Sequence, residues 1–199
     1  MKKLNRSSGV LLHITSLPGP YGIGEIGPQA FKFVDDLAEM NQKLWQILPD
    51  NPTDGNNCPY GSISAFGNNP LLISLDFLIR DGWLSSEDIK NYPKSNSNKI
   101  SFKEINSIRN SLLSKSVDNF LKNITDNQST DFKKFCKKNK YWLDDFALFN
   151  VLQEVLNEEQ WIKWPSNYKL LNKNHISSFI IKYKNKIKSV KVLQYMYCK

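Results

Sequence analysis

The sequence contains few of the residues from which metal centres, catalytic triads and disulfide frameworks are built. Its 199 residues include only two histidines and three cysteines. His13 and His175 lie far apart, and Cys58, Cys136 and Cys198 show no C-x-x-C spacing. Zinc sites and disulfide scaffolds need clustered or paired ligands, and a Ser/His/Asp triad needs a histidine with a carboxylate partner. We therefore expect reduced thiols, no bound metal and no triad.

Long hydrophobic runs are also missing. No stretch approaches the roughly 18 to 20 apolar residues that span a bilayer. The basic start, MKKLNR, precedes a short apolar stretch, residues 10–14, that His13 interrupts, whereas a signal peptide has about 7 to 15 uninterrupted apolar residues. We expect a cytoplasmic protein with no membrane partner. With 40% hydrophobic residues and a mean hydropathy of -0.46, the chain can build one sizeable globular domain.

Positive charge is concentrated in the second half. The net charge is +8; residues 1–100 hold nine Lys and Arg against ten Asp and Glu, and residues 101–199 hold eighteen against nine. A basic surface can bind nucleic acid, but nearly all of these charges are lysines, and the motifs of RNA-reading modules are absent. Solvated helix faces are the favoured interpretation, with a basic nucleic-acid-binding protein as an alternative.

The first half predicts one βαβ unit. Residues 9–14 and 43–49 are short apolar runs, each followed by a proline- or glycine-rich turn, as expected for buried strands. Between them, Gly27-Pro28 indicates a helix start. The apolar face of that helix is Ala30, Val34, Leu37 and Ala38. The two strands should be parallel neighbours connected through the helix.

From about residue 91 the sequence is typical of helices. Residues 91–98 resemble a linker, and helices are predicted over 102–123, 130–138 and 141–156. Two apolar stripes accompany them: Trp142, Phe146, Phe149, Leu152 and Leu156, and nearer the C-terminus Ile176, Ile180, Tyr183, Ile187, Val190 and Tyr197. Two strands alone are marginal, and residues 192–199 stop inside an amphipathic pattern without a stop signal. We therefore expect an amino-terminal fragment of a larger α/β protein.

The loop after the second apolar run is the main candidate site. Ligands of parallel α/β folds bind at loops that follow the carboxyl ends of strands. In this loop, Asn56-Asn57-Cys58-Pro59-Tyr60 places amides beside an aromatic ring, which suits the C–H faces and hydroxyl rim of a sugar. A surface turn with a packed tyrosine explains the segment equally well at this point.

A glycine-rich segment and two acidic pairs give weaker evidence of function. Residues 19–24 (GPYGIG) lack the remaining glycine and helix start of a dinucleotide fingerprint. The acidic pairs Asp35-Asp36 and Asp144-Asp145 fall within predicted helices, so we do not expect them to form an acid/base pair.

Three segments in order resemble the opening of one enzyme family. They are residues 8–24 (SGVLLHITSLPGPYGIG), 44–49 (LWQILP) and 58–75 (CPYGSISAFGNNPLLISL). They are similar to 4-alpha-glucanotransferase, the amylomaltase or disproportionating enzyme of the alpha-amylase clan. Residues 142–149 (WLDDFALF) and 192–195 (VLQY) fit the helical subdomain of that family.

The resemblance implies an α/β fold that is a partial (β/α)8 TIM barrel with a mainly helical inserted subdomain. Residues 1–90 would form the start of the barrel, with its first two strands, and residues 91–199 the insertion, truncated at the C-terminus. The family transfers α-1,4-glucan segments between maltodextrins by a retaining double displacement, in which one carboxylate attacks and a second acts as acid and base. Both carboxylates would lie beyond Lys199, so this chain would hold no catalytic residue and be inactive alone. No cofactor or metal is implied.

Residue by residue, the resemblance assigns substrate binding to five positions. Tyr60 fits the aromatic platform under the donor sugar. Cys58 stands where the family commonly has Ser, and Asn57 where it often has Asp. His13 and Ser16 belong to the carboxyl end of the first strand, where a structural or substrate-binding role is expected for His13. The expected partners are maltodextrin or starch-derived α-1,4-glucans, and a non-catalytic glucan-binding module remains an alternative.

Overall fold

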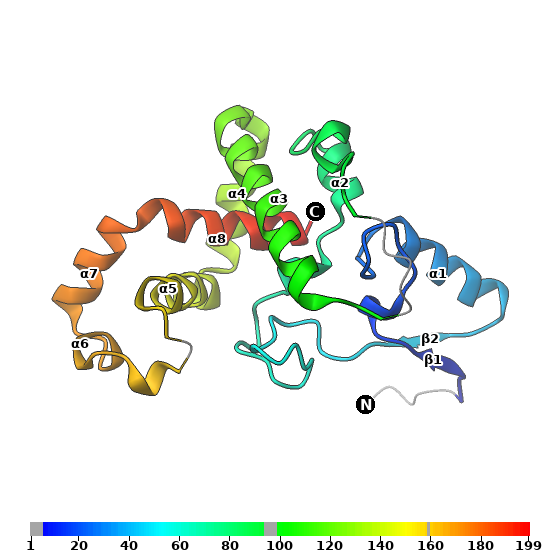
Figure 1. Ribbon diagram of the computed structural model, residues 1–199, viewed down its shortest axis with the longest axis horizontal. Coiled ribbons are helices and arrows are strands. Elements are labelled where there is room, and N and C mark those ends of the chain that lie inside the picture. The colour runs from blue at the N-terminus through cyan, green and yellow to red at the C-terminus, as the bar shows by residue number, and fades with distance from the viewer. Residues whose placement is uncertain (1–5, 94–98, 159) are drawn as a thin grey trace. The chain divides into compact units, whose positions relative to one another are not determined.

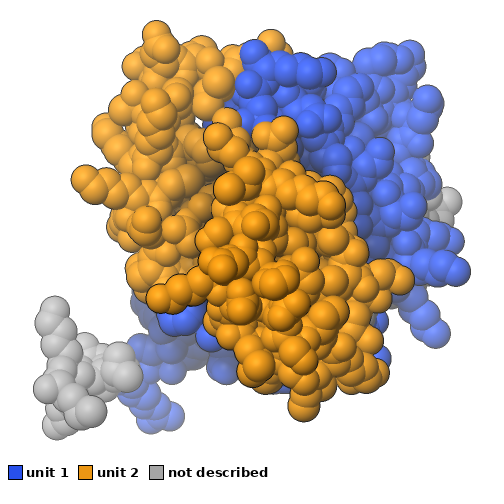
Figure 2. All heavy atoms as spheres, turned by 90° about the vertical axis from the view of Figure 1, so that its left-hand side faces the viewer, with its two compact units in different colours: residues 1–122 blue, residues 123–199 orange. Residues whose placement is uncertain are grey.

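The computed structural model describes residues 6–93, 99–158 and 160–199 (Figure 1). The chain divides into two compact units, residues 1–122 and 123–199, which Figure 2 shows in different colours. The first is called unit 1 and the second unit 2. The basic start of the sequence, residues 1–5, and most of the predicted linker, residues 94–98, lie outside the described residues.

Unit 1 begins with the predicted βαβ unit. The elements β1 (Gly9–Leu11), α1 (Pro28–Glu39) and β2 (Leu44–Gln46) follow in order. The strands pair in parallel, with Gly9 opposite Leu44. A Cβ atom at Gly9 would lie 2.3 Å from the Leu44 carbonyl oxygen, so the close approach of the strands requires glycine. The prediction that the two apolar runs are parallel neighbours in one sheet is confirmed.

The strands are shorter and less buried than predicted. Leu11 and Leu44 are each 58% exposed. Val10 and Trp45 are half-buried, and the Trp45 ring packs edge-on against Phe33 of α1, with 5.0 Å between ring centroids. The prediction of two buried strands is wrong because each strand has a single neighbour in this two-stranded sheet. One neighbour and one helix cover only part of the side-chain surface.

Helix α1 begins where the sequence predicts, with Pro28 at its first position. Proline is favoured there because its missing N–H would have no partner inside the helix. Of the predicted apolar face, Ala30 and Leu37 are buried, but Val34 is 48% exposed and Ala38 is exposed. The buried face of α1 is therefore narrower than the periodicity predicts.

The rest of unit 1 consists of short helices and one long helix. These elements are the 3-10 helices η1 (Ile14–Ser16), η2 (Pro70–Leu72) and η3 (Ser86–Ile89), and the helices α2 (Leu75–Arg80) and α3 (Phe102–Asn123). Helix α3 has the predicted bounds. A capping box at Ser85 precedes η3, and in it the Ser85 backbone N–H donates to Asp88 Oδ2 at 2.9 Å.

A buried ion pair connects α3 with the segment that precedes α1. The fully buried guanidinium of Arg109 donates to the Glu25 carboxylate and to the Ile73 carbonyl oxygen. Glu25 also accepts the Leu75 backbone N–H, at 3.3 Å. Burial raises the pKa of Glu25, and the Arg109 charge opposes that rise. The two partners are 84 positions apart, so the pair fixes distant segments of unit 1 to one another.

Unit 2 consists of helices. They are α4 (Asp126–Lys138), α5 (Lys140–Leu156), η4 (Trp161–Lys163), α6 (Ser166–Lys169), α7 (Lys173–Lys182) and α8 (Lys184–Tyr197). Helix α4 begins earlier than the predicted residue 130 because a capping box forms at Thr125. The Gln128 backbone N–H donates to the Thr125 hydroxyl at 3.3 Å, and the Thr125 N–H donates to the Gln128 side chain at 3.0 Å.

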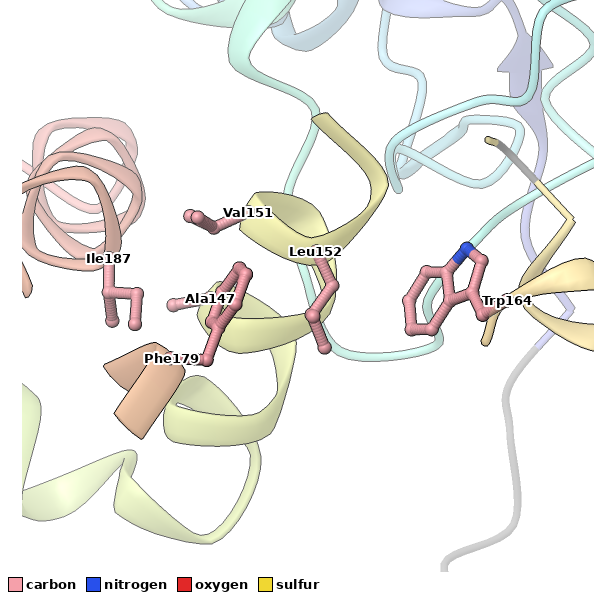
Figure 3. Packing of buried hydrophobic residues seen from close by; sticks show 6 residues of the cluster. All are labelled: Ala147, Val151, Leu152, Trp164, Phe179 and Ile187. Atoms are coloured by element: carbon pink, nitrogen blue, oxygen red, sulfur yellow. The ribbon is translucent and has the colours of Figure 1, made fainter. Parts of the chain in front are cut away.

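The core of unit 2 lies around α5, which packs against α8. One buried cluster, drawn in Figure 3, is Ala147, Val151, Leu152, Trp164, Phe179 and Ile187. A second contains Trp142, Leu143 and Phe146. The predicted C-terminal stripe is only partly buried: Ile187 is 8% exposed, whereas Ile180 is 41% exposed. The helix is also interrupted at Tyr183, between α7 and α8, so the apolar residues do not form one continuous stripe.

The observed fold class is α/β, rich in helices, with one two-stranded parallel sheet among the described residues. Within the same residues, no helix combines the length and the apolar composition that a membrane span needs.

Candidate functional site

The loop between β2 and η2 is held closed at its base. The Asn69 backbone N–H donates to the Asp50 carbonyl oxygen at 2.9 Å. One step further in, the Asn51 side-chain amide donates to the Gly67 carbonyl oxygen at 2.8 Å. We call residues 50–69 the Tyr60 loop. Because both ends of the loop are tied together, the residues between them project as one ordered unit.

The tip of the Tyr60 loop is a tight turn. The Asp54 N–H donates to the Gly61 carbonyl oxygen at 2.8 Å, and the Gly61 N–H donates to the Cys58 carbonyl oxygen at 2.9 Å. The Asp54 carboxylate accepts the Asn56 backbone N–H at 3.0 Å. A Cβ atom at Gly61 would lie 2.8 Å from that carboxylate, so a larger residue there would displace the Asp54 side chain. The turn carries Tyr60 outward.

Tyr60 borders an open pocket. Its side chain is 75% exposed. The pocket measures about 410 Å³ and is lined by Pro49, Asn51, Pro59, Tyr60, Ser62, Ile63, Ser64 and Ala65. It thus combines an aromatic ring with one amide and two hydroxyl groups, the combination of apolar and polar groups that binds the face and the rim of a sugar ring.

His13 lies at the end of β1, immediately before η1. Burial lowers its pKa, and the nearby Asp50 charge raises the pKa by less. The imidazole is therefore neutral at pH 7. Its Nδ1 atom is buried without a hydrogen-bond partner, so the ring keeps an unused polar atom close to the base of the Tyr60 loop. Ser16, at the end of η1, is exposed, and its N–H donates to the His13 carbonyl oxygen at 2.9 Å.

The five residues assigned from the sequence fall into two groups. Asn57, Cys58 and Tyr60 share the Tyr60 loop, with Asn57 in the left-handed conformation at φ 55° and Cys58 exposed. The pocket lining begins at Pro59, so Tyr60 alone of these three borders the pocket. His13 and Ser16 lie together just after β1, and no hydrogen bond or ring contact among the described residues joins them to Tyr60.

Three polar lining residues were not identified from the sequence. Asn51, Ser62 and Ser64 supply the polar groups of the pocket, and the Ser62 hydroxyl donates to the Ser64 carbonyl oxygen at 2.5 Å. The Asp54-Gly55-Asn56 turn could have indicated them. Such a turn reverses the chain, and it brings the residues on either side of the tip opposite one another.

Acidic side chains outside the loop are engaged in ion pairs. Asp36 accepts from Lys32 one helical turn away, and Asp144 pairs with Lys191 and Lys140. Across the described ranges, no group of three or more His, Cys, Asp and Glu side chains is arranged to hold a metal ion.

Comparison with known proteins identifies relatives along nearly the whole chain. Residues 12–199 match the family model described as 4-alpha-glucanotransferase. A 4-alpha-glucanotransferase of Streptococcus pneumoniae is 40% identical over 166 residues, which cover 83% of this chain and 32% of that protein. One from Aquifex aeolicus is 33% identical over 196 residues, covering 98% of this chain and 38% of that protein. The chain thus spans about a third of the length of these curated relatives.

A solved structure is also similar. The amylomaltase from Streptococcus agalactiae, in complex with acarbose, matches with a TM-score of 0.89 and 34% sequence identity. The match covers 97% of this chain and 39% of that one. At this similarity the fold and the sequence point to the same group of proteins.

Proposed function

This chain belongs to the 4-alpha-glucanotransferase family, and from that membership we propose that it supplies the donor-binding part of an enzyme that transfers α-1,4-glucan segments between maltodextrins. The substrates would be maltodextrin or starch-derived α-1,4-glucans. The transfer would proceed by retaining double displacement, in which a glycosyl group passes first to an enzyme carboxylate and then to an acceptor hydroxyl.

The observation that carries this proposal is the exposed ring of Tyr60 on a closed loop after β2. A ring that is 75% exposed is available to a ligand, and the bonds at the base and tip of the loop hold it in place. Holding the ring in advance reduces the ordering cost of binding. Glucose has apolar C–H faces that stack on such a ring and hydroxyls that reach Asn51, Ser62 and Ser64 at the pocket wall.

Substrate binding and catalysis would come from different parts of the enzyme. This chain would bind and orient the donor glucan through Tyr60, with Asn57, Cys58, His13 and Ser16 as further substrate-binding positions. The neutral imidazole of His13 can give or accept one hydrogen bond to a sugar hydroxyl. The nucleophile and the acid/base carboxyl would come from residues outside 1–199. No cofactor or metal enters this chemistry.

The membership also implies a barrel architecture for the complete enzyme. We propose that β1, α1 and β2 are the start of a (β/α)8 barrel within residues 1–90, and that residues 91–199 form a helical insertion. The parallel pairing of β1 with β2 through α1 supports this, because a barrel of this type repeats that unit. The position of the Tyr60 loop after the second strand supports it too, since barrel enzymes bind ligands on such loops. The cytoplasmic location expected from the sequence stays a prediction.

Two alternatives differ in measurable ways. A non-catalytic glucan-binding module would bind maltodextrin through Tyr60 and support no transfer in any context. A nucleic-acid-binding protein would show an affinity for DNA or RNA that falls steeply with salt. Several lysines of unit 2 are already paired with carboxylates, among them Lys186 with Glu154 and Lys199 with Asp131, which disfavours the second alternative.

A chimera tests the proposed activity. Residues 12–199 would replace the matching segment of the Streptococcus pneumoniae relative, and glucose release from maltotriose would be measured. We expect disproportionation activity in the chimera and a loss of at least about fivefold in kcat/KM when it carries Tyr60→Ala, because the stacking contribution is lost. A folded chimera without transfer activity, beside an active parent, would contradict the proposal.

A further inference from the structure

Unit 2 contains a second pocket, which none of the predicted site residues borders. It lies between α6, α7 and the junction of α7 with α8, and it measures about 270 Å³. We call it the α7 pocket. Pockets for drug-sized ligands measure roughly 300 to 1,000 Å³, so this one suits a small ring.

One wall of the α7 pocket is aromatic. Phe179 is buried and forms the base, and its ring centroid lies 5.6 Å from that of Tyr168 and 4.5 Å from that of Tyr183. Both tyrosines are half-buried. Phe179 also belongs to the buried cluster of Figure 3, so the core of unit 2 fixes the wall in place. A fixed aromatic surface binds a ligand at a lower entropic cost than a mobile one.

Part of the pocket lining is polar. Asn174, Ser178 and Lys182 follow one another at one-turn intervals on α7, so their side chains share a helix face, and all three are exposed. They offer an amide, a hydroxyl and an ammonium group. The Lys182 ammonium lies 5.2 Å from the centre of the Tyr183 ring, where a cation is attracted to the aromatic face.

His175 completes the rim and is held by two asparagines. Its Nε2 lies 3.1 Å from the Asn167 side-chain amide nitrogen. Its Nδ1 lies 3.2 Å from Asn172 Oδ1. The two asparagines therefore fix the orientation of the imidazole.

The chemistry of the lining selects among ligand classes. An anion such as phosphate is best held by several cations or by a set of backbone N–H groups, whereas here one lysine accompanies an amide, a hydroxyl, an imidazole and three aromatic rings. Aromatic rings beside amide and hydroxyl groups fit a ring with apolar faces and hydroxyl edges. We propose that the α7 pocket binds a glucose unit of an α-1,4-glucan, at a second site separate from the Tyr60 loop. The choice of a glucan rests on the proposed function; the preference for a neutral hydroxylated ring rests on the pocket.

The test is a titration of the 199-residue chain with maltotriose, followed by backbone amide NMR. We expect saturable shifts at Asn174, Ser178 and Lys182. Asn174→Ala should weaken this binding by about twofold to tenfold, because one hydrogen bond is lost. Ser178→Ala serves as a second variant of the same rim. The matched control Asn127→Ala, at an exposed position of α4, should leave the binding unchanged.

The outcomes separate this proposal from the one for the Tyr60 loop. In a Tyr60→Ala variant the α7 shifts should persist with the same affinity, since the two pockets have no lining residue in common. The absence of saturable shifts in α7 would overturn the proposal even if the Tyr60 loop responds. Shifts insensitive to both rim variants, or stronger shifts with inorganic phosphate than with maltotriose, would overturn it as well.

Discussion

All nine glycines and eight of the nine prolines lie within residues 1–93, whereas residues 123–199 contain no glycine and one proline. Charge is divided as unequally: residues 1–122 hold thirteen Lys and Arg against twelve Asp and Glu, and residues 123–199 hold fourteen against seven. Unit 1 accordingly consists of turns, short helices and two short strands around long loops, and unit 2 of helices joined by short connections.

The difference shows in what holds each unit together. Unit 1 buries an apolar core, which includes Leu72, Leu113 and Phe120, together with the ion pair of Arg109 and Glu25. Unit 2 buries apolar clusters around α5, and among its described residues no charged side chain is buried. A buried charged pair depends on both partners being present, whereas an apolar cluster depends on the volume that its side chains fill. The two units should therefore fail under different substitutions.

The largest effect is expected from Arg109→Ala. Removal of one partner leaves the Glu25 charge buried and uncompensated, which costs about 3 to 5 kcal/mol of the free energy of unfolding. Amide hydrogen exchange, read separately for each unit, should show the loss in unit 1. The control Arg80→Ala removes an exposed pair with Asp81 and should cost less than about 1 kcal/mol. An equal loss in both variants would contradict the role of the buried pair.

Leu143→Ala should lower the stability of unit 2. Leu143 is 0% exposed in the cluster with Trp142 and Phe146, and such truncations cost about 2 to 5 kcal/mol through lost burial and the cavity left behind. The matched control Leu170→Ala, at a side chain 76% exposed, should change stability by less than about 0.5 kcal/mol. If exchange in unit 1 rose as much as in unit 2 with Leu143→Ala, the comparison between separately held units would fail.

A smaller loss of stability is expected when the pH is lowered. Burial lowers the pKa of His13 in the folded chain below its usual value of about 6.5. Between the lowered pKa of the folded state and the usual pKa of the unfolded state, the folded chain binds fewer protons than the unfolded chain. The free energy of unfolding therefore rises with pH over this range. This contribution is present above pH of about 6.5 and is lost as the pH falls through the folded-state pKa.

The variant His13→Gln should remove this part of the pH dependence in unit 1. The measurement is the urea midpoint of unit 1 at pH 7.5 and pH 5.5, compared between the wild-type chain and the variant. His175→Gln, in unit 2, is the control and should keep the wild-type difference. A pH dependence unchanged by His13→Gln would show that the buried imidazole is not its source.

Much of the fold could be predicted because local signals were strong. The Gly27-Pro28 start of α1, the bounds of α3 and the parallel pairing of the strands each follow from short-range rules. Burial was harder to predict, as Val34 and Ile180 show, because periodicity identifies an apolar face without showing whether another segment covers it. The pair of Arg109 and Glu25 has no local signature at all, since its partners are 84 positions apart.

The candidate site was predictable to a similar degree. The Tyr60 loop was identified by its place after a strand and by the resemblance of residues 58–75 to one family. Its pocket also uses Asn51, Ser62 and Ser64, which come together only because the loop closes through Asp54 and Gly61. Side chains brought together by a loop's own hydrogen bonds cannot be identified from spacing.

The central claim is that the Tyr60 ring stacks on a glucose unit, and a calorimetric titration with maltohexaose tests it most directly. The titration would use the wild-type chain and its variants Tyr60→Ala and Tyr60→Phe. Loss of the ring should reduce the binding free energy by about 1 to 3 kcal/mol, at least about fivefold in Kd, while the phenylalanine variant keeps most of the affinity. Equal affinities for the wild-type chain and Tyr60→Ala would contradict the claim.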